Sequence, residues 1–326
     1  MRSSRIPVFL AKKILGAIIT IFLVMSIFFT LLHIVPGGDM VTRLIPFASA
    51  EEKAGLRELW GLNKPLYEQY LVFMKKVFTL DYRLVPDQET TSMDRVIFFL
   101  PYTLLLFGTA TVISYLIGVF LGIRLLSRGG EKLKSFVSGV SIVFYAIPAF
   151  VFAISFKNWF VFRYQIFQPV DAFNGEAATF LEHLHNMWLL LPAMALPLLI
   201  LVLVGLARPL LLLKDHMSLL LDEPFVTTAR AKGLSENAVL SKHVARCALL
   251  PLLNDASINL ALIISGGILI EYIYDWPGIG MLLFSALKYL YYPTIGAAIF
   301  MLTVILLVSM IIVDGLNAYL DPRVRL

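Results

Sequence analysis

Long apolar runs constrain the fold of this chain more than any other feature of its sequence. Several runs of at least 18 predominantly apolar residues recur along its 326 residues. A helix needs about 20 such residues to cross the hydrocarbon of a bilayer. Hydrophobic residues make up 59% of the chain and charged residues only 15%, which is too apolar for a soluble protein. The sequence therefore predicts an all-α, polytopic membrane protein.

Six membrane spans are expected. The first, residues 14–36, follows a short N-terminus (1–13) and is too long for the core of a cleaved signal peptide. A polar segment, residues 37–96, comes next and contains an amphipathic helical stretch at Tyr67–Phe78. The remaining spans are expected near residues 97–123, 136–156, 187–207, 252–272 and 294–313, and a short turn is expected between the last two.

Prolines and glycines interrupt several of these spans. They have two interpretations: ordinary close packing of membrane helices, or kinked helices that line a pathway. No inverted repeat is visible that would indicate a secondary-transporter fold. The interrupted positions are Pro148, Pro192, Pro197 and Gly266–Gly267.

Lysine and arginine are distributed unevenly among the short loops. Sixteen lie in the N-terminus, in loops 124–134 and 208–246 and in the C-terminal tail, and three lie in the two short loops opposite. Because positive residues remain on the cytoplasmic side, both termini are expected in the cytoplasm. The net charge of +5 is explained by these loops, and no nucleic-acid partner is expected. Segments 37–96 and 157–186 are then external, and acidic side chains in the second would bind a soluble partner: Asp171, Glu176 and Glu182.

No enzyme motif is present. The sequence lacks GxxxxGK[ST], HExxH and GxSxG, so no catalytic residue is assigned and an ATP site would have to lie on another subunit. His183 and His185 are two residues apart and do not share a helix face, so no metal site is expected. Cys247 is the single cysteine, which excludes an intrachain disulfide.

Three acidic residues lie near the ends of the expected spans: Asp255, Glu271 and Asp314. Each could be a solvated or partnered charge at a helix end, or part of the polar lining of a translocation path. Glu271 is the preferred pathway candidate.

The stretch Glu223–Pro251 reads as two short helices with a corner between them. Pro224 suits a first helical turn, Gly233 suits the left-handed position after a helix, and Ser235 can cap the next helix. Such a pair could lie on the membrane surface or dock onto a partner protein. The apolar face of the second helix is expected to hold Val239, Leu240, Val244, Cys247, Ala248 and Pro251.

The sequence of this stretch resembles that of a known family. TARAKGLS (228–235), followed by VLxxHxxRxALLP (239–251), is similar to the cytoplasmic EAA loop of binding-protein-dependent ABC importer permeases of the oligopeptide/dipeptide/nickel branch. Further similar segments occur in order along the chain: HIVPGGD, GLNKPLYEQYL, PYTLLLFGTATVISYLIGVFLG, GGILIEYIYDWPGIG and DGLNAYLDPRVR. Three places depart from the pattern, namely Thr227, where the loop carries glutamate or arginine, Cys247, where asparagine is frequent, and LDYR (80–83).

The resemblance implies a type I ABC importer permease fold, with a transmembrane domain over 97–326 and a coupling loop over 209–251. It implies that the loop binds an ATPase through Glu223, Thr227, Thr228, Ala229, Arg230, Ala231, Lys232 and Gly233. The implied partners are a second permease, two ATPases that bind ATP and magnesium, and an extracytoplasmic binding protein. This chain itself would carry no cofactor.

The implied location is the bacterial inner membrane, and the implied cargo is oligo- or dipeptides. The alternatives are nickel chelates or glutathione-like compounds as cargo, a secondary transporter or channel without ATPases, and a scaffold without a transport role.

Overall fold

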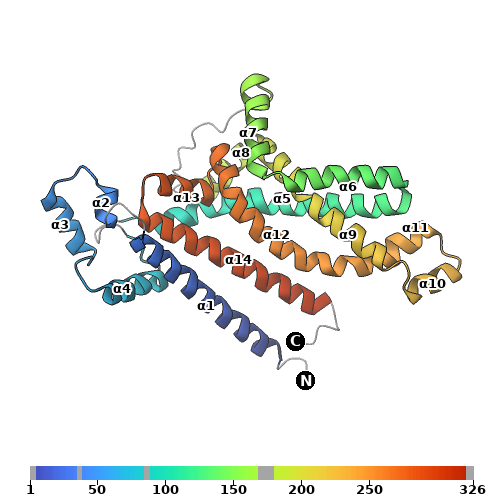
Figure 1. Cartoon of the computed structure of the whole chain (residues 1–326), viewed down its shortest axis with the longest axis horizontal. Helices are drawn as coiled ribbons and strands as arrows, with labels where there is room; N and C mark the ends of the chain where they lie inside the picture. Colours follow the sequence, from blue (N-terminus) through green and yellow to red (C-terminus); the bar gives the residue numbers. More distant parts are fainter. Residues whose placement is uncertain (1–4, 35–38, 84–88, 168–179, 321–326) are drawn as a thin grey trace. The chain divides into compact units, whose positions relative to one another are not determined.

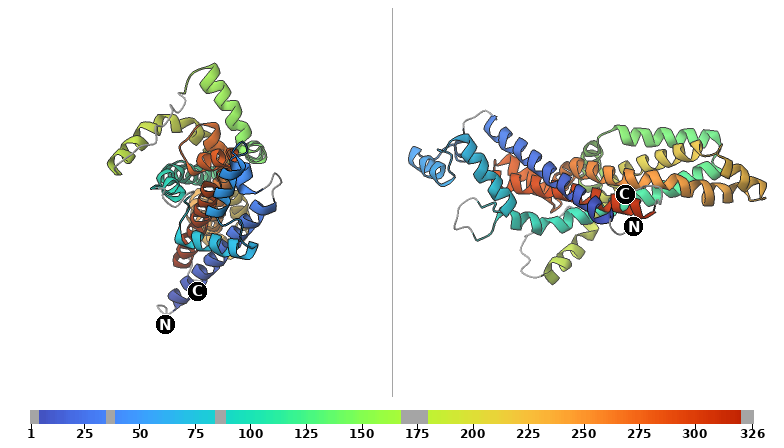
Figure 2. Two further views of the ribbon diagram at one scale, coloured as in Figure 1. Left: turned by 90° about the vertical axis from the view of Figure 1, so that its left-hand side faces the viewer. Right: turned by 90° about the horizontal axis from the view of Figure 1, so that it is seen from below.

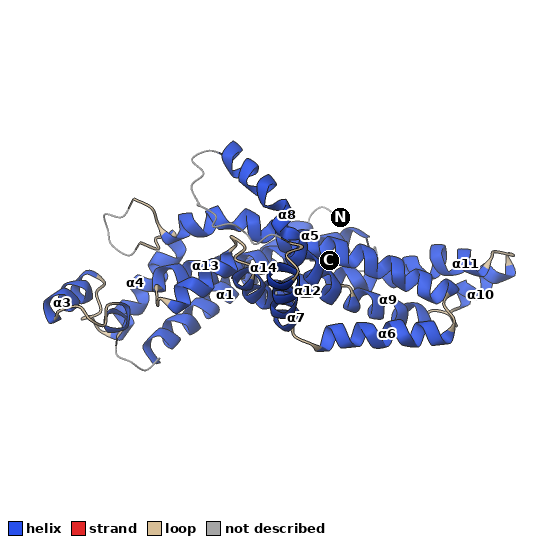
Figure 3. Cartoon of the chain, turned by 90° about the horizontal axis from the view of Figure 1, so that it is seen from above, coloured by secondary structure: helices blue, strands red, loops and turns tan. Residues whose placement is uncertain are grey.

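The computed structural model describes residues 5–34, 39–83, 89–167 and 180–320, and every regular element within them is a helix (Figures 1 and 3). The predicted all-α fold is confirmed. The chain divides into two compact units. Unit 1 comprises Met1–Pro101 and Pro277–Val308, and unit 2 comprises Tyr102–Trp276 and Ser309–Arg325.

Four helical stretches in the described residues are long and apolar enough to cross a membrane: Ala11–Ile34, Ser92–Ser127, His185–Leu219 and Tyr292–Gly315. They match the first, second, fourth and sixth expected spans. The fifth expected span falls within α12 (Ala245–Ile273), whose 29 residues extend about 43 Å at 1.5 Å per residue.

The third expected span is not one continuous helix. The structure has α6 (Glu131–Ala146) and then α7 (Ala149–Phe156) with the π-helix η1 (Lys157–Arg163), bent by 89° at the break. Pro148 lacks the N–H that would continue α6, and its ring forces Ile147 into an extended conformation (φ −84°, ψ 127°). The proline thus separates two helices. Neither helix alone is long enough to cross a membrane, and the bent pair is long and apolar enough only when both helices are counted as one span.

Unit 1 is built from short helices around the ends of two long ones. Its elements are α1 (Arg5–Ile34), α2 (Met40–Leu44), α3 (Ala50–Leu59), α4 (Leu66–Thr79), α13 (Ile279–Lys288) and the first part of α14 (Tyr292–Leu320). The predicted amphipathic stretch is α4, which packs along α1 (Figure 2). Ser26 of α1 and Tyr70 of α4 share a hydrogen bond of 2.7 Å between their hydroxyl oxygens. The apolar helix α13 replaces the turn expected between the last two spans.

An ion pair fixes the short helices of unit 1. Asp39 accepts a hydrogen bond from the backbone N–H of Thr42 at 2.9 Å and so caps α2. The same carboxylate pairs with Arg57 of α3. The hydrogen bond from Arg57 holds the pKa of Asp39 well below its usual range.

Unit 2 contains most of α5 (Ser92–Arg128), then α6, α7 and η1, and the helices α8 (Phe180–Gly205), α9 (Ala207–Leu219), α10 (Pro224–Ala231), α11 (Glu236–Ala238), η2 (Val239–Val244) and α12. Within it α12 packs along α9, α7 and α8. Two glycines allow α5 to approach α9 and α12 closely. A Cβ at Gly118 would lie 2.8 Å from Pro209, and one at Gly267 would overlap the ring of Phe107. The contact at Gly267 favours the packing interpretation for that glycine.

Candidate functional site: the coupling loop and the buried polar groups behind it

The corner of the loop has the predicted local structure. Glu223 is extended before α10 (φ −72°, ψ 145°), and Pro224 occupies the first helical position. Gly233 lies just past the helix with φ +78°, a conformation that side chains rarely adopt. Ser235 then caps α11 by accepting a hydrogen bond from the N–H of Ala238 at 3.4 Å. In unit 2 this corner lies beyond the ends of α9 and α12 (Figure 1).

A salt bridge closes the corner. Arg230 of α10 donates from Nε and Nη2 to the two carboxylate oxygens of Glu236, at 3.0 and 2.6 Å. This bidentate geometry is the strong form of an arginine–carboxylate pair. It lowers the pKa of Glu236 below its ordinary value and raises that of Arg230. The pair is exposed and links α10 to α11 across Gly233.

The coupling loop has an inner and an outer face. Val226 and Ala229 point inward and are buried with Val239 and Leu240 against α9. Ala229 is small because the protein's own core surrounds it, and its side chain does not face a partner. The other residues assigned to ATPase binding are exposed: Glu223, Thr227, Thr228, Arg230, Ala231, Lys232 and Gly233. Nothing in the structure tests their role, which stays a prediction.

The second helix of the loop runs without a break into the membrane helix. Helix α11, the π-helix η2 and α12 are consecutive, although the sequence predicts a separate span from residue 252. Val239, Leu240, Val244 and Ala248 are buried as expected. The π turn inserts an extra residue, and Ala245 and Leu252 are buried with them, whereas Pro251 is only half-buried. Cys247, expected on that face, is consequently exposed. The loop and α12 are therefore connected by consecutive helical residues without an intervening turn.

Helix α12 carries a buried ion pair in its N-terminal half. Asp255 accepts a hydrogen bond from Nε of Arg208 on α9 at 2.6 Å, and its other oxygen accepts one from the hydroxyl of Tyr115 on α5 at 2.7 Å. Arg208 also donates to the hydroxyl of Tyr145 on α6 at 3.3 Å. The charges thus join four helices of unit 2. Sequence reasoning singled out Asp255 but missed Arg208, although an arginine inside the apolar run 198–213 was a usable signal.

The pathway candidate Glu271 lies near the other end of α12 and is fully buried. Its carboxylate accepts a hydrogen bond from the hydroxyl of Thr103 on α5 at 2.8 Å. In this conformation Glu271 holds α5 and α12 together. A part in the translocation path stays a prediction and requires these two helices to separate.

Two other predicted features are only partly visible. Asp171 and Glu176 of the external docking segment lie outside the described residues, whereas Glu182 is exposed in the first turn of α8. The side chain of His183 is also outside the described part. Among the described residues no group of three or more histidine, cysteine, aspartate or glutamate side chains could hold a metal ion.

The loop and the buried charges behind it lie in the part of the chain that a known family matches. Residues 114–326 match the binding-protein-dependent transport system inner membrane component, and residues 6–88 match the N-terminal part of such membrane components. The chain belongs to this permease family. The predicted type I ABC importer permease class is thereby confirmed, and the permease is a multi-pass inner membrane protein. Family membership also implies ATPase and binding-protein partners.

Curated relatives cover almost the whole permease. It is 30% identical to the oligopeptide transport system permease protein AppB of Bacillus subtilis, over 91% of this chain and 92% of the relative. It is 26% identical to the dipeptide permease DppB of Lactococcus lactis, over 98% and 99%. It is 27% identical to the glutathione permease GsiC of Shigella flexneri, over 97% and 98%.

Proposed function

We propose that the permease is one of the two membrane subunits of an ATP-driven importer and that it passes peptides into the cell. The observation that carries this proposal is the coupling loop, a corner with an exposed outer face that continues directly into α12. The oligopeptide and dipeptide permeases among its relatives support peptides as the cargo. The relative named as a glutathione permease favours glutathione-like compounds as the second candidate cargo.

The mechanism follows from the connections of the loop. The outer face of α10 lies in a groove of an ATPase subunit, which binds ATP and magnesium. Closure of the two ATPases moves α10, and the Arg230–Glu236 pair links α11 to it. The motion then reaches α12 as a whole, because α11, η2 and α12 are one helix. This displacement opens the permease toward the binding protein.

Transmission through α12 involves both buried polar contacts. Asp255 couples α12 to α9 and α5, and Glu271 couples it to α5 nearer the other end. Polar contacts of this kind have few alternative partners inside a membrane, so they favour discrete arrangements of the helices over gradual sliding. The pathway opens when the Glu271–Thr103 contact breaks.

Uptake by the reconstituted importer tests the proposal. Proteoliposomes with both permeases, the two ATPases and the binding protein are expected to accumulate labelled di- to pentapeptides only with ATP inside. Omission of the ATPases, or of the binding protein, is expected to abolish accumulation. Uptake that persists without the ATPases would identify a secondary transporter or channel. Normal peptide uptake by cells that lack the chain would leave the scaffold alternative.

A further inference from the structure

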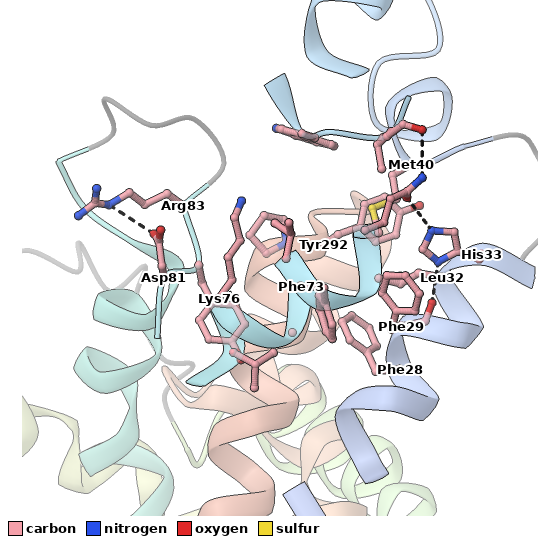
Figure 4. A pocket seen from close by; sticks show the side chains of 18 residues that line it. Phe28, Phe29, Leu32, His33, Met40, Phe73, Lys76, Asp81, Arg83 and Tyr292 are labelled. Atoms are coloured by element: carbon pink, nitrogen blue, oxygen red, sulfur yellow. Dashed lines mark hydrogen bonds and ion pairs between the residues drawn. The ribbon is translucent and has the colours of Figure 1, made fainter. Parts of the chain in front are cut away.

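Unit 1 contains a pocket that the coupling mechanism does not use (Figure 4). Side chains from α1, α4 and the start of α14 surround a cavity of about 130 Å³. Its walls are mainly apolar, and their aromatic part includes Phe28, Phe29, Trp60 and Phe73. An engineered apolar cavity of about 150 Å³ accepts benzene, so this volume suits one ring-sized group.

Two buried hydroxyls in the pocket have no hydrogen-bond partner among the described residues. They belong to Tyr82 and Tyr292, whose side chains are 5% and 6% exposed. Most buried polar groups in native proteins are hydrogen-bonded, so this unpartnered pair is unusual. The two oxygens have almost no accessible surface of their own, so they lie within the wall and do not face an occupant of the cavity.

The charges at the pocket favour an anionic group. Lys76 lines the cavity and forms no ion pair within the described residues, whereas Arg83 lies 3.6 Å from Asp81 (Figure 4). One lysine is therefore available for a carboxylate. An apolar ring with a carboxylate beside it would match both the ring-sized, partly aromatic cavity and the lysine at its edge.

The distribution of residues around α4 indicates from which side such a group enters the pocket. At 100° per residue, the pocket residues Gln69, Val72 and Lys76 lie on one side of the helix. A second side carries exposed apolar residues suited to lipid: Tyr67, Leu71 and Phe78. The polar residues Glu68, Lys75 and Thr79 lie between these two sides. The pocket therefore opens toward water, and its occupant comes from a soluble molecule.

We propose that this pocket is an anchor point for the docked binding protein and receives one large apolar side chain flanked by an acidic residue. The inference rests on the proposed function and on the topology that places the end of α1 outside the cell. A buried ring-sized anchor surrounded by less critical contacts is a frequent arrangement at protein interfaces. The lysine adds the charge complementarity that guides docking.

Two matched pairs of variants on α4 test the pocket. Val72→Trp fills it from its open side, and Leu71→Trp places the same ring on the neighbouring exposed face. Lys76→Glu reverses the charge in the pocket, and Lys75→Glu reverses the adjacent charge outside it. The probe is the binding protein whose addition stimulates ATP hydrolysis by the reconstituted importer, and its Kd is measured on nanodiscs at low and high salt.

Val72→Trp is expected to weaken binding about ten-fold or more, and Leu71→Trp to leave it within about two-fold. Lys76→Glu is expected to weaken binding and flatten its salt dependence more than Lys75→Glu does. Equal effects within both pairs would overturn the inference. If the wild-type permease binds the binding protein and takes up peptide, but the two variants of each pair bind it equally well, only the pocket assignment fails. If the wild type shows neither property, the proposed function fails as well.

Discussion

Arg208 and Asp255 form a buried ion pair, with 2.6 Å between Nε and Oδ1, that joins α9 to the helix leading out of the coupling loop. The side chain of Asp255 is only 8% exposed. A charge in such a place is costly unless it is paired. The pair therefore requires α9 and α12 to move together when the loop is displaced.

Removal of one partner is expected to harm the permease more than removal of both. Arg208→Met leaves Asp255 buried without its cation, which should cost about 3 kcal/mol or more of stability. The double variant Arg208→Met/Asp255→Leu removes both charges and should recover much of that loss. Thermal unfolding in detergent measures both variants. A double variant less stable than Arg208→Met would contradict the account.

A side chain at Gly233 is expected to uncouple the importer without unfolding it. The left-handed conformation strains any β-branched residue by about 1 kcal/mol or more, which is small beside the packing of the membrane helices. Gly233→Val should reach the membrane near normally and lose peptide uptake and peptide-stimulated ATP hydrolysis. Normal uptake would leave the loop as a pair of helices lying on lipid.

Because α10 has a buried and an exposed face, the same substitution is expected to have different effects at the neighbouring residues Ala229 and Thr228. Ala229→Glu places a carboxylate in the core of unit 2 and should reduce expression and thermal stability. Thr228→Glu changes only the exposed face and should leave stability unchanged while it weakens binding of the ATPases. Co-purification of the ATPases, measured beside unfolding, separates the two effects. Loss of stability in both variants would mean that the outer face is not free for a partner.

The Arg230–Glu236 pair predicts a pH and charge dependence of coupling. Because the folded-state pKa of Glu236 is lowered, its contribution is present above the unfolded value of about 4.3 and is lost as pH falls through the folded value. The pair is therefore fully formed at neutral pH, and coupling should not change with pH in that range. Glu236→Gln should reduce ATP-driven uptake at pH 7, and the swap Arg230→Glu/Glu236→Arg should restore part of it. Lys242→Gln, at an exposed residue of η2, is the control.

The exposed thiol of Cys247 tests the topology. With both termini in the cytoplasm, an impermeant maleimide should not label intact cells and should label opened membranes. A permeant maleimide is the positive control for access to the thiol. Labelling of intact cells by the impermeant reagent would place the loop outside and overturn the assignment.

Features set by neighbouring residues could be predicted from the sequence. Pro224, Gly233 and Ser235 specify the corner through backbone preferences that act within a few residues. The amphipathic period of α4 is local in the same way. The membrane spans could also be predicted, because the apolar interior of the membrane requires apolar residues along the whole length of each span.

Features that depend on distant partners could not be predicted. Asp255 meets Arg208 and Tyr115, which are 47 and 140 positions away, and no local pattern encodes such pairs. The sequence places Pro148 within an expected span, but whether a membrane helix bends or breaks at proline depends on its neighbours. The pocket of unit 1 likewise combines residues from both ends of the chain.

The π turn of η2 sets the rotational phase between the coupling loop and α12. Each residue in a helix advances the side chains by about 100°. A loop transplanted from a permease without this turn would arrive on α12 rotated by that angle, with its outer face directed away from the ATPase. Exchange of loops between permeases therefore requires a matching number of residues between Ser235 and Asp255, even where the loop sequences themselves are compatible.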